Sequence, residues 1–261
     1  MEQSPMMRPT TTTTATATQY GAAIGEYRRS KASIFLIICG IALLAAGVFF
    51  AAVAPTLSGG QSDASGLFAE VLVGVLFIAA ALYAFWTVFS WRGAHAQLFE
   101  RGFVLSRAGK TMDARWEDIA SVTQYVVRMR YYGIPVWTSH RYDVTLNNGD
   151  AFRINNGFAR VGKLGEAVQR MSTNVLLPRA IAAYTSGAVL PFGKLSVSQA
   201  GISNGQETLP WSDLNQLTFQ NGSVILTRKG KRVRWTAAPI RKTPNVYVLN
   251  GLVGYVQRGI R

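Results

Sequence analysis

The sequence predicts a membrane α-helical hairpin followed by an α+β region made of two tandem units. Two long uncharged apolar stretches, a strongly basic remainder and an internal repeat predict this fold class. Only 15% of the 261 residues are charged, whereas average soluble domains carry about 25% charged residues. The low charge density therefore indicates a membrane component.

The N-terminal segment 1–31 is polar and Thr-rich and has no hydrophobic periodicity. Such segments bury too little apolar surface to fold, so we expect a disordered tail. No charged residue occurs in 32–54 or in 71–91, and we predict transmembrane helices at about 32–54 and 68–91. The first stretch has 23 residues. At about 1.5 Å per residue, a helix of this length crosses a hydrocarbon core of about 30 Å.

Basic residues flank the two apolar stretches on one side only. The connection 55–70 holds no Lys or Arg, and the flanking basic residues are Arg28, Arg29, Lys31, Arg92, Arg101 and Arg107. Because positive charge stays on the cytoplasmic side, we expect a multi-pass protein of the inner or plasma membrane with both termini in the cytoplasm. The alternative is a signal peptide cleaved after Ala54, but its apolar core is longer than such peptides usually have. Gly40 and Gly47 are small enough to let the two helices approach closely.

The net positive charge belongs to the C-terminal part of the chain. Residues 1–91 contain four basic and four acidic residues, so the other 23 Lys and Arg and 9 Asp and Glu give the whole net charge of +14. Cys39 is the sole cysteine, which excludes an intrachain disulfide and fits a reducing compartment. A basic surface tethered to a membrane favours anionic partners.

An internal repeat organises this basic part. The recurring residues are Gly102, Trp116, Asp118 and Ile119 in the first copy and Gly201, Trp211, Asp213 and Leu214 in the second. Each copy continues with alternating residues around a Gly-containing turn, which predicts a β-hairpin. Each copy then ends in a helical pattern. We therefore expect an antiparallel unit at 96–175, a helical connector at 176–190 interrupted at Pro178, and a second unit at 191–261.

The Gly…Trp-x-Asp-Ile/Leu pattern, together with Trp235 and the segment 243–246 before the last helix, resembles bacterial membrane proteins of unknown function that carry pleckstrin-homology-like (PH-like) domains. The resemblance implies that each unit is a small antiparallel β-barrel or sandwich closed by its helix. It implies no activity. We expect the repeated tryptophans to fill the barrel mouth and the repeated aspartates to cap a local turn.

Residues suited to catalysis or metal binding are scarce. His95 and His140 have no Cys or His partner at metal-ligand spacing, and the sequence has no nucleophile elbow, Walker loop or dinucleotide fingerprint. The adjacent acids at 117–118 correspond to Ser212 and Asp213 in the second copy, which argues against a paired-acid site. We therefore predict a protein that is not an enzyme and needs no cofactor.

One candidate site for an anionic ligand is the turn of the hairpin predicted in the second unit. Strand alternation brings several cations to one tip, and the candidate lipid-contacting residues are Arg228, Lys229, Lys231, Arg232 and Arg234. Near an anionic leaflet each such cation contributes about 1 kcal/mol. The alternative is an ordinary solvated hairpin.

A second candidate is the segment 125–141, which the first unit has and the second lacks. It mixes aromatic residues with arginine, a composition that suits lipid headgroups, a protein strand or single-stranded nucleic acid. The candidate partner-binding residues are Arg128, Arg130, Tyr131, Tyr132 and Trp137. The alternative is a long hairpin that only covers the barrel or packs against its neighbour.

These observations favour a membrane-anchored binding or scaffold protein. Its basic cytoplasmic PH-like domains would contact anionic lipid headgroups or a protein partner. The alternatives are an accessory subunit of a membrane complex and a membrane-tethered nucleic-acid-binding protein, of which nucleic acid is the less favoured partner.

Overall fold

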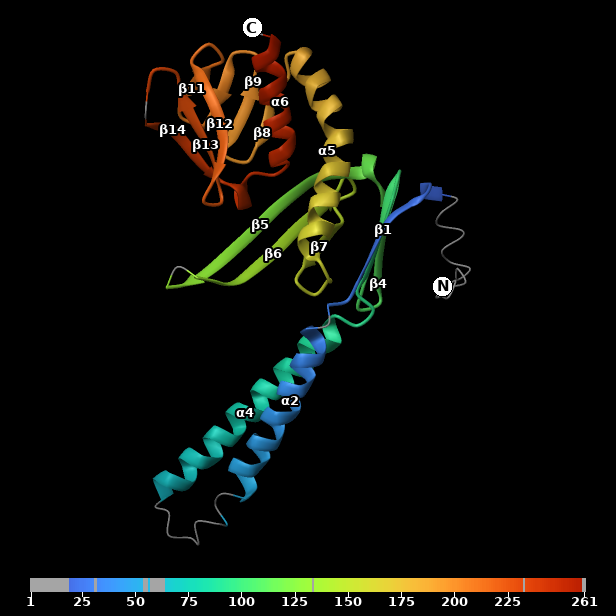
Figure 1. Ribbon diagram of the computed structural model, residues 1–261, viewed down its shortest axis with the longest axis vertical. Helices are drawn as coiled ribbons and strands as arrows, with labels where there is room; N and C mark the ends of the chain where they lie inside the picture. The colour runs from blue at the N-terminus through green and yellow to red at the C-terminus, as the bar shows by residue number, and fades with distance from the viewer. Residues whose placement is uncertain are drawn as a thin grey trace, which may run out of the picture.

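The structure is a computed structural model that describes residues 19–30, 32–53, 56, 64–132, 134–231 and 233–259. Three parts follow one another along the long axis: two helices at one end, an antiparallel β unit in the middle and a second β unit at the other end (Figure 1). We call these parts the helix pair, unit 1 and unit 2. Two apolar helices and several antiparallel sheets are therefore confirmed.

The helix pair consists of α2 and α4. Helix α2 spans Ala32–Val48 and continues as a π-helical segment, Phe49–Val53, while α4 spans Ala64–Ser90. The segments Ile34–Val53 and Phe68–Ser90 are long and apolar enough to span a membrane, and only 11% and 17% of these segments, respectively, is buried. Neither helix is therefore the core helix of a soluble domain, because a core helix is mostly buried.

Helices α2 and α4 pack directly against each other where Gly47 meets Gly74. A Cβ atom added to Gly47 would lie 3.0 Å from the carbonyl oxygen of Gly74, and one added to Gly74 would lie 2.9 Å from that of Gly47. The two glycines therefore allow the backbones to touch, as small residues do between membrane helices. Gly40 makes a looser contact, since its added Cβ would lie 3.3 Å from the ring of Phe85.

Unit 1 begins before the helix pair. Its first sheet has the antiparallel order β1-β2-β3-β4, with strands β1 (Ala23–Arg28), β2 (His95–Phe99), β3 (Gly102–Arg107) and β4 (Lys110–Arg115). Strand β1 pairs with β2, placing Ala23 opposite Phe99 and Arg28 opposite His95. The helix pair is therefore an insertion between two neighbouring strands of one sheet (Figure 1).

The prediction of a disordered tail over 1–31 is wrong for the part that includes β1, while residues 1–18 lie outside the described residues. Tyr20 is buried, and its hydroxyl donates a hydrogen bond to Asp113 across 2.8 Å. Burial and this hydrogen bond raise the pKa of Tyr20 to about 12. No local pattern marks β1, because the strand is short, contains Gly25 and gains its stability from a partner beyond both helices.

The second sheet of unit 1 follows a 3₁₀ turn at Trp116–Asp118. Its order is β5-β6-β7, with β5 (Ile119–Tyr131), β6 (Ile134–Leu146) and β7 (Ala151–Asn155), and helix α5 (Val161–Thr185) comes next. Strands β6 and β7 form the hairpin that the sequence predicts. Beyond β7, the ladder between β5 and β6 continues as a two-stranded ribbon over 126–140, which we call the arm.

Unit 2 repeats this order of elements. A sheet ordered β11-β10-β9-β8 precedes one ordered β12-β13-β14, and helix α6 (Val246–Gly259) closes the chain. The strands are β8 (Leu190–Phe192), β9 (Leu195–Ser198), β10 (Gly201–Ser203), β11 (Thr208–Pro210), β12 (Leu214–Gln220), β13 (Ser223–Arg228) and β14 (Arg234–Pro239). The ladders among the described residues form separate sheets, so neither unit is a closed barrel.

Each unit has its own hydrophobic core. The core of unit 1 includes Leu98, Phe103, Trp116, Tyr142, Ile154 and Leu164, and that of unit 2 includes Leu195, Ile202, Trp211, Leu226, Leu249 and Leu252. Gly165 lets α5 lie against the ring of Tyr142, because a Cβ atom there would overlap the ring. A fully buried Leu, Ile or Phe contributes about 1.5–3 kcal/mol, so each unit holds itself together largely through these residues.

Helix α5 is shared by the two units. Val161, Leu164 and Val168 pack into the core of unit 1, whereas Leu177 and Ile181 pack against that of unit 2. The predicted interruption at Pro178 is wrong, because α5 runs through Pro178 as one helix. An interior proline removes one helical hydrogen bond, and packing against unit 2 on the C-terminal side offsets that loss.

Units 1 and 2 also meet at Asn245, just before α6. Its backbone N–H donates to the carbonyl oxygen of Val122 on β5, and its side-chain oxygen accepts from the N–H of Val122 at 2.9 Å. The side-chain amide donates to the carbonyl oxygen of Ala120 at 3.0 Å. Asn245 has a φ of 52°, a left-handed conformation that asparagine tolerates better than most residues. Unit 2 is therefore bonded to the outer edge of β5.

Candidate functional site

The strongest candidate site lies where α4 enters unit 1, and we call it the junction (residues 89–93 and 107–109). Trp91 packs edge-on against Phe158 with ring centroids 5.9 Å apart. Gly157 leaves room for the Trp91 ring, because a Cβ atom on Gly157 would overlap it. The chain entering α2 is held at the same place, since the N–H of Ser30 donates to the carbonyl oxygen of Gly157 at 2.8 Å. Both ends of the helix pair are thus fixed to one loop of unit 1.

Arg107 joins the β3–β4 turn to the end of α4. Its guanidinium lies over the Trp91 ring, 4.0 Å from the ring centroid, and its Nε donates to the carbonyl oxygen of Ser90 at 3.3 Å. A cation over an indole face is the strongest of the common cation–π arrangements. Burial and the nearby positive charge of Arg153 lower the pKa of Arg107. Arg107 is therefore a partly buried cation held between Trp91 and the end of α4.

A pocket of about 340 Å³ opens beside Arg107, lined by Phe89, Arg92, Gly93, Ala108 and Gly109. The guanidinium of Arg92 lies 5.3 Å from the centroid of the Phe89 ring. Among the ion pairs of the described residues, none involves Arg92 or Arg107. The pocket therefore combines an aromatic wall with the guanidinium group of Arg92, which pairs with no carboxylate in the described part of the chain. Guanidinium groups bind phosphate and carboxylate oxygens through paired N–H donors.

The turn of β13 and β14 contains the first set of sequence-predicted residues. Arg228 is not an available cation, because it pairs with Glu207 at 2.8 Å and approaches Asp213 at 3.9 Å. Lys229, Lys231 and Arg234 are exposed, and Arg232 lies outside the described residues. Unit 1 lies between this unit and the helix pair (Figure 1). The lipid contact proposed for this turn remains a prediction.

Glu207 explains why Arg228 is held. The same carboxylate accepts a hydrogen bond from the indole N–H of Trp235 at 3.0 Å and one from Arg228 at 2.8 Å. These two hydrogen bonds lower the pKa of Glu207. The contact links β14, β13 and the loop before β11, and its residues serve the fold of unit 2 rather than a ligand.

The second sequence-predicted set lies in the arm. The backbone ladder places Arg128 opposite Thr138, Met129 opposite Trp137 and Arg130 opposite Pro135, and it ends at the pair Tyr131 and Ile134. The side chains of Arg128, Arg130, Tyr131 and Trp137 lie outside the described part of the structure. Tyr132 occupies the turn with a φ of 48° and is 89% exposed. The long hairpin is therefore confirmed as a backbone feature, and its partner remains a prediction.

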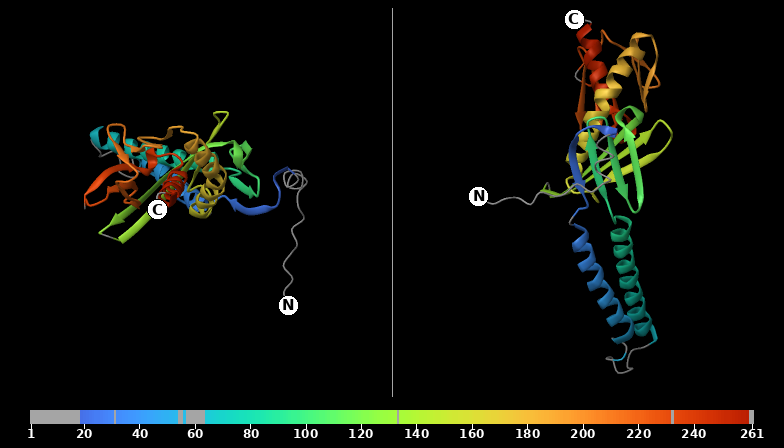
Figure 2. Two further views of the ribbon diagram at one scale, coloured as in Figure 1. Left: turned by 90° about the horizontal axis from the view of Figure 1, so that it is seen from above. Right: turned by 90° about the vertical axis from the view of Figure 1, so that its right-hand side faces the viewer.

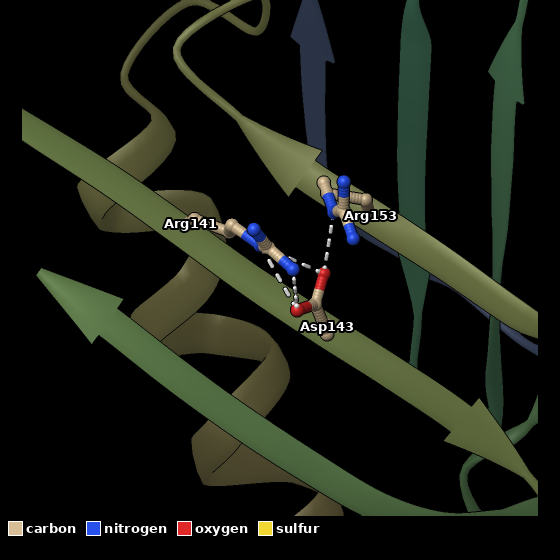
Figure 3. Close-up of polar contacts among 3 residues, drawn as sticks. All are labelled: Arg141, Asp143 and Arg153. Carbon is tan, nitrogen blue, oxygen red and sulfur yellow. Dashed lines mark hydrogen bonds and ion pairs between the residues drawn. The ribbon is translucent and has the colours of Figure 1, made fainter. Parts of the chain in front are cut away.

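Asp143 pairs with two arginines near the base of the arm (Figure 3). Its carboxylate accepts from Arg141 at 2.7 Å and from Arg153 at 2.8 Å. Partial burial opposes ionisation, but the hydrogen bonds from Arg141 and Arg153 prevail and lower the pKa of Asp143. The spacing of Arg141 and Asp143 in the sequence places them on one face of β6. The sequence does not show that Arg153, on β7, also pairs with Asp143.

A second pocket, of about 370 Å³, lies between α5 and α6 and therefore between the two units. Its lining is mixed, and the residues are Glu166, Gln169, Arg170, Thr173, Asn174, Leu177, Tyr247, Asn250 and Gly251. Gly251 permits the close approach, since an added Cβ would lie 2.7 Å from the Leu177 side chain. Burial and the charge of Glu166 raise the pKa of Tyr247. Sequence patterns did not indicate this pocket, because it exists only after both units dock.

Within the described ranges, no group of three or more His, Cys, Asp or Glu residues is placed to hold a metal ion. His95 lies 3.1 Å from Glu26, which also binds Arg28, so this histidine belongs to the β1–β2 pairing. His140 stacks against the ring of Tyr142, with ring centroids 6.4 Å apart. The two histidines are thus placed apart, each within its own local packing.

The fold and the junction together define a class of chain in which two apolar helices are inserted into the first of two antiparallel β units. This chain belongs to a family of unknown function, DUF6585, whose model matches residues 1–261. No curated protein matches the chain, and no solved structure matches it.

Proposed function

We propose that this protein is a non-enzymatic membrane-anchored binding protein whose junction binds anionic phospholipid headgroups. In this proposal, the helix pair spans the bilayer, and units 1 and 2 are tandem PH-like domains on the cytoplasmic side. The pocket beside Arg92 and Arg107 then lies at the level of the headgroups. Phosphate oxygens satisfy the guanidinium groups, and acyl chains lie along the exposed face of α4 near Phe89.

One observation carries this proposal: Arg92, which pairs with no carboxylate among the described residues, lines a pocket at the end of an apolar helix, and Arg107 precedes Ala108 of the same pocket. Aromatic residues prefer the interfacial zone of a bilayer, and Phe89 and Trp91 lie at this end of α4. A charged group beside that zone is stabilised by anionic lipid, by about 1 kcal/mol for each Lys or Arg. The arrangement thus suits an anion that arrives from the membrane.

The side of the membrane follows from the pairing of β1 with β2. Because these strands are neighbours in one sheet, both ends of the helix pair must lie on the same side of the bilayer. Arg28, Arg29 and Arg92 occur at these ends, whereas the connection 55–70 has no Lys or Arg. Positive charge is retained in the cytoplasm, which supports the proposed cytoplasmic position of both units.

The PH-like assignment rests on the order of elements. Each unit has a four-stranded antiparallel sheet, a three-stranded antiparallel sheet and then a helix. The repeated tryptophans lie at equivalent places, between the first sheet and the second. This shared order supports the PH-like assignment alone, because a fold does not carry a function by itself, and the lipid-binding proposal rests on the junction.

The experiment is lipid binding by the full chain in detergent, followed by native mass spectrometry with phosphatidylglycerol or phosphatidylcholine added. We expect at least threefold more phosphatidylglycerol on the unaltered protein than on the double variant Arg92→Gln, Arg107→Gln. The matched control, Lys163→Gln with Arg258→Gln, removes the same charge from two exposed helix positions. Equal lipid retention by all three proteins would overturn the proposal.

A further inference from the structure

The pocket between α5 and α6, which we call the inter-unit pocket, lies where unit 2 docks on the helix that both units share. Helices α5 and α6 lie side by side in each view of the molecule (Figure 1 and Figure 2). Gly251 on α6 allows this approach, because a Cβ atom there would lie 2.7 Å from the Leu177 side chain on α5. The pocket has a volume of about 370 Å³, which is within the range of small-molecule sites, and such sites often lie at domain interfaces.

Most polar side chains of the inter-unit pocket have no bonding partner in the protein. Within the described part of the chain, six of those that line it make neither an ion pair nor a side-chain hydrogen bond: Glu166, Arg170, Thr173, Asn174, Tyr247 and Asn250. Gln169 is only 4% exposed and donates to Gln124 at 3.0 Å, while its own side-chain oxygen accepts from no described residue. These donors and acceptors are therefore available to a molecule bound between the helices.

Glu166 and Arg170 bring one charge of each sign to the pocket. A glutamate four residues before an arginine on a helix is well placed to pair with it, yet these two line the same pocket without an ion pair. The charge of Glu166 acts on two tyrosine hydroxyls instead. Together with burial, which is the larger cause, it raises the pKa of Tyr247 and raises that of Tyr142 to about 12. The pocket therefore favours a cation at Glu166 and an anion at Arg170.

The spacing of these charges along α5 suits a short peptide better than a free amino acid. Residues four apart on a helix are separated by about 6 Å along its axis, and two extended residues span about 7 Å. A dipeptide can therefore reach Glu166 with its ammonium group and Arg170 with its carboxylate, whereas a free amino acid carries both groups on one carbon atom. Asn174 and Asn250 each offer a donor and an acceptor to a peptide group. Leu177, farther along α5, lines an apolar part of the same pocket.

We propose that the inter-unit pocket binds a short zwitterionic peptide, namely a dipeptide with apolar side chains. Its ammonium group binds Glu166 beside the ring of Tyr247, its carboxylate binds Arg170, and its peptide group bonds to the side-chain amides. A bound dipeptide thereby joins unit 2 to the shared helix at a second place besides Asn245. The proposal does not depend on lipid binding at the junction, because the two pockets share no residue.

The test is equilibrium dialysis of the full chain in detergent with tritiated L-leucyl-L-leucine, measured against the same detergent without protein. Three unlabelled competitors report which groups matter. N-acetyl-L-leucyl-L-leucine lacks the ammonium group, L-leucyl-L-leucine amide lacks the carboxylate, and L-leucine lacks the second residue. Because a hydrogen bond to a charged group contributes about tenfold or more to affinity, we expect each competitor to bind at least about tenfold more weakly than the unlabelled dipeptide.

Two variants assign the charged groups of the dipeptide to their partners. Glu166→Gln is expected to weaken the free dipeptide at least about tenfold and to leave the N-acetylated competitor unaffected, since that molecule has no ammonium group to lose a partner. Arg170→Gln is expected to weaken the free dipeptide and to leave the amide competitor unaffected. The matched controls are Glu117→Gln and Arg258→Gln, at exposed positions outside the pocket, and both should bind the dipeptide as the unaltered protein does.

Retention of the dipeptide no greater than in detergent alone would overturn the proposal. Equal competition by the blocked dipeptides or by L-leucine would overturn it as well, and so would an equal loss of binding in the control variants. The double variant Arg92→Gln, Arg107→Gln should retain the dipeptide like the unaltered protein. Failure of peptide binding and failure of lipid binding at the junction are therefore separate results.

Discussion

The indole N–H of Trp116 donates a hydrogen bond to the carbonyl oxygen of Phe99 at 2.9 Å. Unit 2 contains the same relationship, in which Trp211 donates to Ser198 at 2.9 Å. Both acceptors lie three residues before the repeated glycine. In each unit, the tryptophan therefore ties the turn that follows the four-stranded sheet to the turn between the second and third strands of that sheet. The two units thus share this hydrogen bond as well as the repeated residues.

Replacing either tryptophan by phenylalanine should weaken its own unit. The substitution leaves a buried carbonyl oxygen without its donor, a loss of about 1–3 kcal/mol. Hydrogen exchange measured by mass spectrometry should show faster exchange in β2–β4 for Trp116→Phe and in β9–β11 for Trp211→Phe. Each variant is the control for the other, and exchange that rises equally in both units would contradict two separately stabilised units.

Bulky residues at the glycine contact should separate the helix pair. Gly47→Leu and Gly74→Leu each place a side chain where the facing backbone lies within 3.0 Å, so we expect lower thermal stability in detergent and faster proteolysis between the helices. The matched control is Gly254→Leu on α6, where an added Cβ meets nothing within 4 Å. Unchanged thermal stability of Gly47→Leu would show that the helices do not pack through this contact.

The bond between the units should depend on the side chain of Asn245. Asn245→Gly keeps the left-handed backbone but loses both side-chain hydrogen bonds, whereas Asn245→Ala also strains the backbone at a φ of 52°. We expect increased hydrogen exchange at 119–123 in both variants, with the larger loss of stability in Asn245→Ala. A backbone strain of this kind costs about 1 kcal/mol. Equal exchange in Asn245→Gly and the unaltered protein would exclude an interface held by this side chain.

Acid should weaken unit 1 partly through Asp143. The folded-state pKa of this carboxyl is below its usual value of 3.8, so its favourable contribution is complete above that value and disappears as the pH falls through the lower, folded-state pKa. The thermal midpoint of the unaltered protein should therefore fall more steeply below about pH 4 than that of Asp143→Asn. Parallel curves for the two proteins would mean that Arg141 and Arg153 do not stabilise the ionised carboxylate.

Features that depend on local pattern could be predicted from the sequence. The two apolar stretches predicted helices α2 and α4, and alternation around Gly149 and Gly230 predicted the hairpins β6–β7 and β13–β14. The repeated tryptophans marked equivalent turns. These signals are local because each residue is read against neighbours a few positions away.

Features that depend on distant partners were missed. Strand β1 pairs across the whole helix pair, and Gly74 matters only because Gly47 faces it. The sequence presents Arg228 as an available cation, because the sequence does not show that Glu207 pairs with it. The junction pocket needs the end of α4 beside the β3–β4 turn, and the distance between these segments is set by the fold and not by their spacing in the sequence.

The position of the helix pair between β1 and β2 also has a consequence for biogenesis. The edge strand of unit 1 is made first, yet its partner emerges from the ribosome only after both helices have been synthesised. If one helix alone entered the bilayer, β1 and β2 would be on opposite sides and the sheet would lack its first strand. Completion of unit 1 therefore requires that the two helices enter a bilayer together or not at all, and a half-inserted chain would leave the edge of β2 unpaired.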